Sequence, residues 1–307
     1  MRTAIFAGAA SALALLTPAF SKPVSPAPYD VGALQVEQPA SKGAPLIFIP
    51  GLASGSWTWK DSAARLGTGH AVYLLTLPGF DGRKPIPGAT LMTLSRDLKK
   101  LIETKHLKRP VLIGHSLGGT LALSFAAEHP DLIAGVIAVD GLPVFPGTEA
   151  MTGDRSALAQ RAHAQLDGQT PEQFAAYQQT YMKQFGTIDE ARAKMIAEYS
   201  SRSDPHAVAD FAAQALMLDL RPKLTAITVP VVEISPFYAP DFAAMGVDEA
   251  GKTNYYRMLL DGIEKLEVMS VSPARHFVMF DQPEKFATTL DAALAKVYEF
   301  TPAKSAP

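Results

Sequence analysis

The sequence predicts an α/β fold in which helices cover both faces of a doubly wound, mostly parallel sheet. Short apolar runs alternate with helical patterns along most of the 307 residues, and this rhythm is typical of βαβ units. Between residues 143 and 222 the rhythm stops and only helical patterns remain. We therefore expect one sheet-based core, residues 22–142 and 223–307, with a helical insertion between two of its strands.

The individual elements follow from hydrophobic periodicity. Runs rich in β-branched and apolar residues predict strands at 46–49, 71–77, 111–114, 136–139, 231–234 and 266–271. Apolar spacing of three and four predicts core helices at 57–66, 90–106, 117–128, 254–265 and 283–300. Because the strands are separated by helices, they are expected to run parallel.

The insertion holds three helical stretches, at 170–185, 187–201 and 204–220, each with a capping residue near its start. An insertion between two strands of such a sheet is well placed to form a lid over the strand ends, where ligands bind. The alternative is a set of packing helices with no role at a site, since its methionines and aromatic residues also suit a plain core.

The first residues are expected to be a signal peptide, residues 1–21. Arg2 is followed by an apolar run at 4–16 and by small residues around Ala19 and Ser21, the pattern of an export signal. A retained anchor is the alternative, but the run is shorter than the roughly 20 residues that span a bilayer. We expect an exported protein, periplasmic or secreted, with no stable membrane insertion after cleavage.

Composition excludes several classes of function. Hydrophobic residues make up 48% and charged residues 19% of the chain, which is typical of a globular protein. A net charge of −2 and the lack of a basic stripe argue against nucleic acid as a partner. With no cysteine, no ligand-spaced cluster of carboxylates and histidines and no phosphate-binding glycine loop, we expect no metal and no other cofactor.

One turn carries a recognisable catalytic pattern. Residues 114–118 read Gly-His-Ser-Leu-Gly between a predicted strand and a predicted helix, which is the context of a G-x-S-x-G nucleophile elbow. The two glycines leave room for a sharp turn that lifts Ser116 above the sheet, where the start of the next helix favours negative charge. We predict that Ser116 is a nucleophile, the alternative being an ordinary glycine-rich turn.

Four segments in order resemble an α/β-hydrolase of the lid-bearing serine esterase type, from about Pro45 to the last helix. Besides the elbow they are "FIPGLASGSWTW" (48–59), "TLPGFDGRKP" (76–85) and "HFVMFDQPEKF" (276–286). Pro50 and Thr76 depart from the usual histidine and aspartate of the family. By position, the resemblance implies an oxyanion hole made by the backbone amides of Leu52 and Leu117.

A serine nucleophile needs a base and an acid that orients the base. The resemblance and the position after the last strand select His276 as the base, whereas His115 is expected to pack rather than react. The other histidines read as surface or helix-end residues: His70, His106, His129, His163 and His206.

The acid has two candidates. In the family it usually follows the strand predicted at 231–234, but there the first aspartate is Asp241, two or three residues late. A known alternative places it after the preceding strand, where "GVIAVDGLP" supplies Asp140. We favour Asp140 and keep Asp241 as the alternative.

These observations favour a secreted or periplasmic serine hydrolase that cleaves a small-molecule ester or related acyl bond. A cofactor-free perhydrolase or C–C bond hydrolase could use the same residues, and a catalytically inactive hydrolase fold could serve as a binding protein. A serine at the elbow disfavours the alkyl-enzyme route of dehalogenases and epoxide hydrolases.

Overall fold

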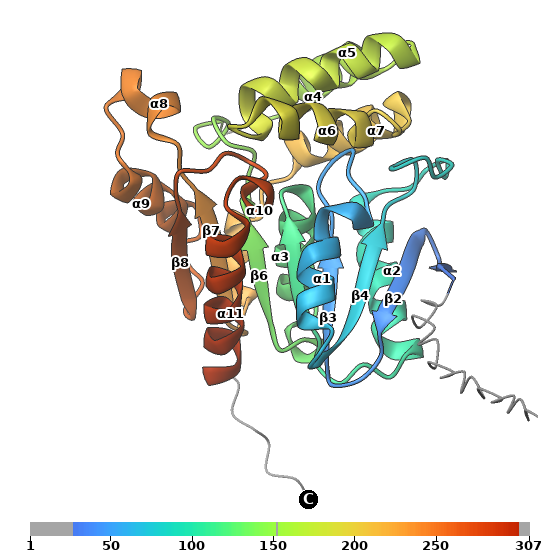
Figure 1. Cartoon of the computed structure of the whole chain (residues 1–307), viewed down its shortest axis with the longest axis vertical. Helices are drawn as coiled ribbons and strands as arrows, with labels where there is room; N and C mark the ends of the chain where they lie inside the picture. The colour runs from blue at the N-terminus through green and yellow to red at the C-terminus, as the bar shows by residue number, and fades with distance from the viewer. Residues whose placement is uncertain (1–26, 152, 301–307) are drawn as a thin grey trace, which may run out of the picture.

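The sheet has eight strands in a computed structural model that describes residues 27–151 and 153–300 (Figure 1). Their order is β1-β2-β4-β3-β5-β6-β7-β8. The strands are β1 (Tyr29–Val31), β2 (Leu34–Ala40), β3 (Ala44–Ile49), β4 (His70–Thr76), β5 (Val111–His115), β6 (Gly135–Val139), β7 (Val231–Pro236) and β8 (Leu266–Val271). From β4 to β8 all neighbours are parallel, whereas β1–β2 and β2–β4 are antiparallel. The predicted fold class is therefore confirmed.

The two antiparallel strands at one edge were not predicted from the sequence. In β2, Leu34 and Val36 are fully buried and alternate with partly exposed Gln35 and Glu37. This is the period of two that a strand buried on one face requires. Pro39 lies where a register shift between Glu37 and Ala40 interrupts the pairing with β4, so the alternation covers only the first residues of the strand.

Helices cover both faces of the sheet (Figure 1). One face packs against α1 (Lys60–Leu66) and α11 (Pro283–Glu299), and the other against α2 (Leu91–Thr104), α3 (Leu117–Glu128) and α9 (Glu249–Leu259). Strand β3 shows why: Leu46 and Phe48 belong to the first core, while Ile47 and Ile49 belong to the second. Successive side chains point to opposite faces, so a strand buried on both sides reads as a continuous apolar run.

The helix predicted at 254–265 lies earlier in the chain, at Glu249–Leu259. Helix α9 begins earlier because the Asp248 side chain accepts a hydrogen bond from the amide of Gly251 at 2.7 Å, an N-cap. It ends at Leu259, and Gly262 then takes a φ of +101° in the turn into β8, a conformation that glycine adopts without steric cost.

The helical insertion lies between β6 and β7 and sits above the carboxyl ends of the strands (Figure 1). It consists of α4 (Ser156–Leu166), α5 (Pro171–Tyr181), α6 (Glu190–Ser200) and α7 (Pro205–Met217), with a π-helical turn at Met182–Gly186. The last three α-helices begin at side-chain caps, Thr170, Asp189 and Asp204. Helix α4 was not predicted, because its start at Ser156 has no side-chain cap.

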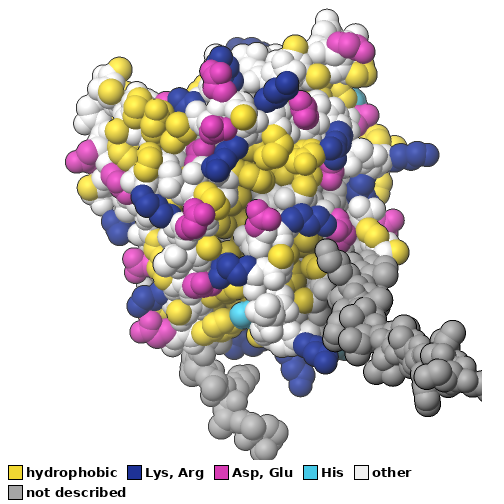
Figure 2. Space-filling model, in the orientation of Figure 1, with side chains coloured by type: hydrophobic (Ala, Val, Ile, Leu, Met, Phe, Trp, Pro, Cys, Tyr) yellow, Lys and Arg dark blue, Asp and Glu magenta, His cyan; other side chains and the backbone are white. Residues whose placement is uncertain are grey.

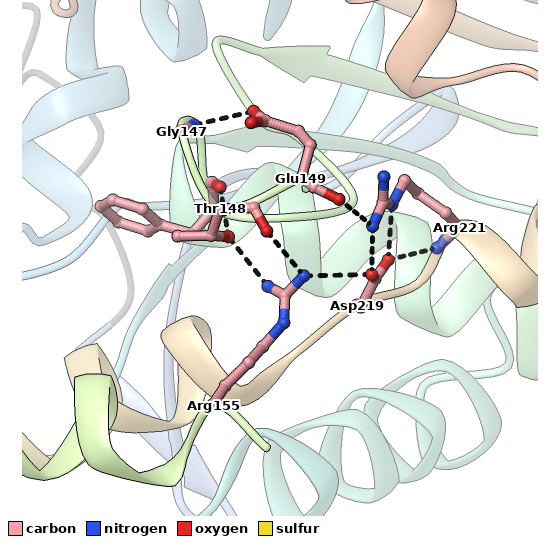
Figure 3. Close-up of polar contacts among 7 residues, drawn as sticks. Gly147, Thr148, Glu149, Arg155, Asp219 and Arg221 are labelled. Atoms are coloured by element: carbon pink, nitrogen blue, oxygen red, sulfur yellow. Dashed lines mark hydrogen bonds and ion pairs between the residues drawn. The ribbon is translucent and has the colours of Figure 1, made fainter. Parts of the chain in front are cut away.

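Polar contacts join the two ends of the insertion (Figure 3). The buried Arg155 donates to the Asp219 carboxylate at 3.1 Å and to the Thr148 hydroxyl at 2.8 Å. Arg221 donates to the same carboxylate at 2.6 Å and to the Glu149 carbonyl at 2.9 Å. Because the entering and leaving segments share Asp219, the two ends of the insertion are held together.

The predicted signal peptide, residues 1–21, lies outside the described residues. Within the described part of the chain, no helix combines the length and the apolar character needed to cross a bilayer. On the face shown in Figure 2, acidic and basic side chains are interspersed.

Candidate active site

The candidate site lies at the carboxyl edge of the central strands. His115 of β5 pairs with Val139 of β6, so the next residues of the two strands, Ser116 and Asp140, are neighbours at this edge. Both have positive φ, 51° and 50°, which is uncommon outside glycine and costs free energy. The amide of Ser116 donates to the carbonyl of Val139 at 2.9 Å, which fixes this turn against β6.

Glycines make the sharp turn at Ser116 possible. A Cβ on Gly114 would lie 2.2 Å from the carbonyl oxygen of Gly118, and a Cβ on Gly118 would lie 2.3 Å from that of Ile49. A Cβ on Gly141, beside Asp140, would lie 3.1 Å from the carbonyl oxygen of Ser116. The sequence pattern around the serine is therefore required by close approaches of the backbone.

His276 and Asp140 are brought together, although they are far apart in the sequence. The Nδ1 atom of His276 lies 2.5 Å from a carboxylate oxygen of Asp140, and both side chains are largely buried. Burial alone would raise the pKa of Asp140, but the hydrogen bond and charge of His276, with Lys252 and Tyr256, hold it well below its usual range. Asp140 is thus a carboxylate at neutral pH, and it can orient the His276 ring.

Asp241 lies elsewhere. It belongs to the short helix α8 (Ala239–Phe242) and accepts two hydrogen bonds from the Arg275 guanidinium, at 2.7 and 2.8 Å. Of the two candidate acids, only Asp140 is hydrogen-bonded to His276 among the described residues. Its catalytic role stays a prediction.

The ring of His115 packs against His276. Its Nε2 atom lies 3.0 Å from the carbonyl oxygen of His276, and the two ring centroids are 4.4 Å apart. Burial, and then the charge of His276, lower the pKa of His115 to about 3. His115 is therefore neutral at physiological pH and can donate from Nε2, in agreement with the expectation that it packs rather than reacts.

The loop after β3 brings a second predicted feature to the same edge. A Cβ on Gly51 would lie 3.2 Å from the Cβ of Ser116, so the amide of Leu52 follows directly beside the nucleophile candidate. Ala53 has a φ of 53°, the kind of strain that accumulates at functional sites. The structure records no hydrogen-bond acceptor for the amides of Leu52 and Leu117 among its described residues, so both are available to an oxyanion.

Two residues beside Asp140 were missed in the sequence analysis. The hydroxyl of Tyr256, in α9, donates to the second oxygen of Asp140. Glu233, fully buried in β7, accepts from the amide of Gly141 at 3.2 Å, and its other oxygen has no partner among the described residues. A glutamate inside the apolar run Val-Val-Glu-Ile was the available signal, because a buried carboxyl group is costly unless it is neutral or paired.

Burial, and then the charge of Asp140, raise the pKa of Glu233 well above its ordinary value, against the opposing effects of Gly141 and Lys252. Because the folded-state pKa of Glu233 is raised, its protonated form contributes fully to stability below the unfolded pKa, about 4.3. This contribution is lost as the pH rises through the folded-state pKa. We therefore expect Glu233→Gln to melt at a higher temperature than wild type at pH 8 and at a similar temperature at pH 4.

Thermal unfolding followed by circular dichroism at both pH values tests this expectation. Glu264→Gln is the matched control, because Glu264 is exposed in the turn before β8 and the change removes the same charge. A Glu233→Gln variant that gains no stability relative to wild type between pH 4 and pH 8 would contradict a neutral buried Glu233.

The helical insertion contacts the loop that carries His276. The amide of His276 donates to the carbonyl of Phe185 at 3.2 Å, and that of Phe277 donates to the carbonyl of Gly186 at 2.9 Å. Aromatic rings follow one another along α5 and the π-helical turn, at centroid separations of 6.5, 6.3 and 5.5 Å: Phe174, Tyr177, Tyr181 and Phe185. Burial, with smaller effects of Tyr177 and the Asp140 charge, raises the pKa of Tyr181 to about 12. Tyr181 thus lies within the electrostatic reach of the candidate site.

Comparison with known proteins identifies the family. The family model described as "Alpha/beta hydrolase family" matches residues 46–289, which is most of the chain. The chain belongs to this family. Strands β4 to β8, most of β3, the turn at Ser116 and His276 lie inside the match.

Individual relatives of this alpha/beta hydrolase are distant. A pimeloyl-[acyl-carrier protein] methyl ester esterase of Edwardsiella ictaluri is 28% identical over 193 residues, 60% of this chain and 71% of that protein. A soluble epoxide hydrolase of Corynebacterium sp. is 28% identical over 105 residues, 34% of this chain and 37% of that one. Across that second match, the chain spans about a third of the length of its curated relative.

Among solved structures, a thermophilic esterase from Thermogutta terrifontis has the same fold. Its TM-score is 0.72 at 19% identity, and the superposition covers 89% of this chain and 99% of the esterase. At this identity the similarity supports the fold alone.

Proposed function

We propose that this alpha/beta hydrolase is a serine hydrolase that cleaves ester bonds in small molecules through an acyl-enzyme on Ser116. The observation that supports it best is the 2.5 Å hydrogen bond between His276 and Asp140, beside a serine held at positive φ in a nucleophile-elbow turn. A base with an orienting carboxylate, next to a hydroxyl at a helix start, is the arrangement used in acyl transfer.

In this mechanism each group has one task. Nδ1 of His276 donates to the Asp140 carboxylate, which leaves Nε2 free to accept the proton of the Ser116 hydroxyl as it attacks the ester carbonyl. The oxyanion is bound by the amides of Leu52 and Leu117. His276 then protonates the leaving alcohol, and by the reverse sequence it activates water to release the acid and free Ser116.

The helical insertion would act as a lid that selects the substrate. Its aromatic row and its hydrogen bonds to the His276 loop support this role. Aromatic side chains favour an apolar group of the ester. We further propose that the protein is exported after cleavage near residue 21, which amino-terminal sequencing of protein recovered from the periplasm or medium tests.

If the pocket is apolar, activity depends on the length of the acyl chain. For p-nitrophenyl esters from acetate to octanoate, we expect kcat/KM to rise with each buried methylene, by up to about 0.8 kcal/mol of transition-state stabilisation, until the pocket is full. The measurement is kcat/KM for each ester under identical conditions. A flat profile would contradict an apolar acyl pocket, and no turnover of any ester would contradict the proposed activity itself.

A further inference from the structure

Two helices of the insertion place matching His and Asp pairs against each other. His163 and Asp167 are four residues apart at the end of α4, and His206 and Asp210 are four residues apart in the first turns of α7. Residues at this spacing lie on one helix face. Helices α4 and α7 pack together, and the two imidazole centroids are 5.8 Å apart.

The two carboxylates lie on opposite sides of the two rings. Asp167 is near both Nδ1 atoms, at 2.5 Å from His206 and 3.9 Å from His163. Asp210 is near both Nε2 atoms, at 3.0 Å from His163 and 3.7 Å from His206. A neutral imidazole has one N–H. If both rings donate from Nε2 to Asp210, their Nδ1 lone pairs both face Asp167.

From this geometry we propose that the Nδ1 atoms of His163 and His206 and the carboxylate of Asp167 bind a divalent transition metal ion, of which Zn²⁺ fits best. Ligand atoms of these three residues all lie within 4.8 Å of one another. In a tetrahedral zinc site, ligands at about 2.0–2.1 Å from the metal are roughly 3.4 Å apart. Small movements of these partly exposed side chains are enough to reach that geometry.

Asp210 completes the arrangement without binding the ion. Histidine ligands of metals usually donate their other ring N–H to a carboxylate, which fixes the tautomer, and Asp210 is in position to do so for both rings. Nitrogen and oxygen donors, two imidazoles and a carboxylate, suit Zn²⁺ with water as the fourth ligand. The divalent charge offsets two neighbouring carboxylates, and the ion joins α4 to α7.

This site is separate from Ser116 and from the proposed ester hydrolysis. From the sequence, His163 and His206 were expected at the surface and no metal was expected. The i,i+4 spacing within each His-x-x-x-Asp pair was overlooked there, and the convergence of the two pairs follows only from the packing of α4 on α7. Two plain His–Asp ion pairs are the competing interpretation, in which protons take the place of the metal.

Zn²⁺ binding to tag-free full-length protein, measured by equilibrium dialysis with metal analysis, tests the proposal. We expect one Zn²⁺ per chain at micromolar free metal, and a rise of the wild-type Tm by a few degrees, because a ligand of the native state stabilises it. His163→Gln, His206→Gln and Asp167→Asn should lose this binding. Asp210→Asn should weaken it by about 10- to 100-fold.

His106→Asn is the control, because His106 is exposed after α2, outside the insertion, and asparagine tolerates its φ of 52°. It should bind Zn²⁺ as wild type does. Melting curves in chelator show whether each variant is folded. No wild-type binding at micromolar Zn²⁺, or binding and a Tm shift that persist in the folded His206→Gln and Asp167→Asn variants, would overturn the proposal.

Discussion

We expect Ser116→Ala to abolish ester hydrolysis, with kcat lower by about 10⁴-fold or more. In the proposed mechanism the change removes the nucleophile, whereas the amides of Leu52 and Leu117 that would bind the oxyanion remain. The fold should be preserved, because the Ser116 hydroxyl has no hydrogen bond among the described residues that would be broken. The measurement is kcat for an active p-nitrophenyl ester, with a melting curve of the same preparation.

The control for this variant is Ser124→Ala. Ser124 lies two turns further along α3, and alanine is favourable in a helix, so activity and Tm should both stay near wild type. If Ser116→Ala keeps more than about a tenth of wild-type kcat, Ser116 is not the nucleophile.

Asp140→Asn has the second largest expected effect. A neutral amide cannot stabilise the imidazolium of His276, and it favours the wrong tautomer of the ring, so kcat should fall by around 10⁴-fold. Asparagine tolerates the positive φ of Asp140, so the loss of activity should exceed any loss of stability.

Asp241→Asn is the matched variant. It breaks an ion pair with Arg275 whose two side chains are partly exposed, and such pairs contribute little stability. We expect nearly wild-type kcat and a small change in Tm. The assignment fails if Asp241→Asn is inactive while Asp140→Asn still turns over at a rate close to wild type.

The central strands and the elbow could be predicted because their signals are local. Buried parallel strands read as apolar runs, and the glycines around Ser116 stand where backbone contacts leave no room for a side chain. The antiparallel strand β2 and the uncapped helix α4 gave weaker patterns, since pairing with β1 and β4 stabilises β2 and packing on α7 stabilises α4. Local periodicity does not record such tertiary contacts.

The parts of the site that have a local sequence signal could also be predicted. Ser116 follows from a motif, and His276 from its place after the last strand. Tyr256 and Glu233 were missed because the sequence does not show that α9 and β7 lie beside Asp140. Without that packing, a tyrosine in a helix and a glutamate in a strand give no sign of a site. The choice of Asp140 over Asp241 rested on where strand β6 ends, and the structure pairs the former with His276.

The most direct test of a nucleophilic Ser116 is covalent labelling. Wild-type protein is treated with a fluorophosphonate probe and analysed by intact mass and peptide mapping, beside Ser116→Ala and Ser124→Ala. A nucleophilic serine predicts one adduct per chain on Ser116 in the wild type and in Ser124→Ala, and none in Ser116→Ala. An adduct on another residue, equal labelling of Ser116→Ala, or no adduct on a wild-type protein that hydrolyses esters would contradict it.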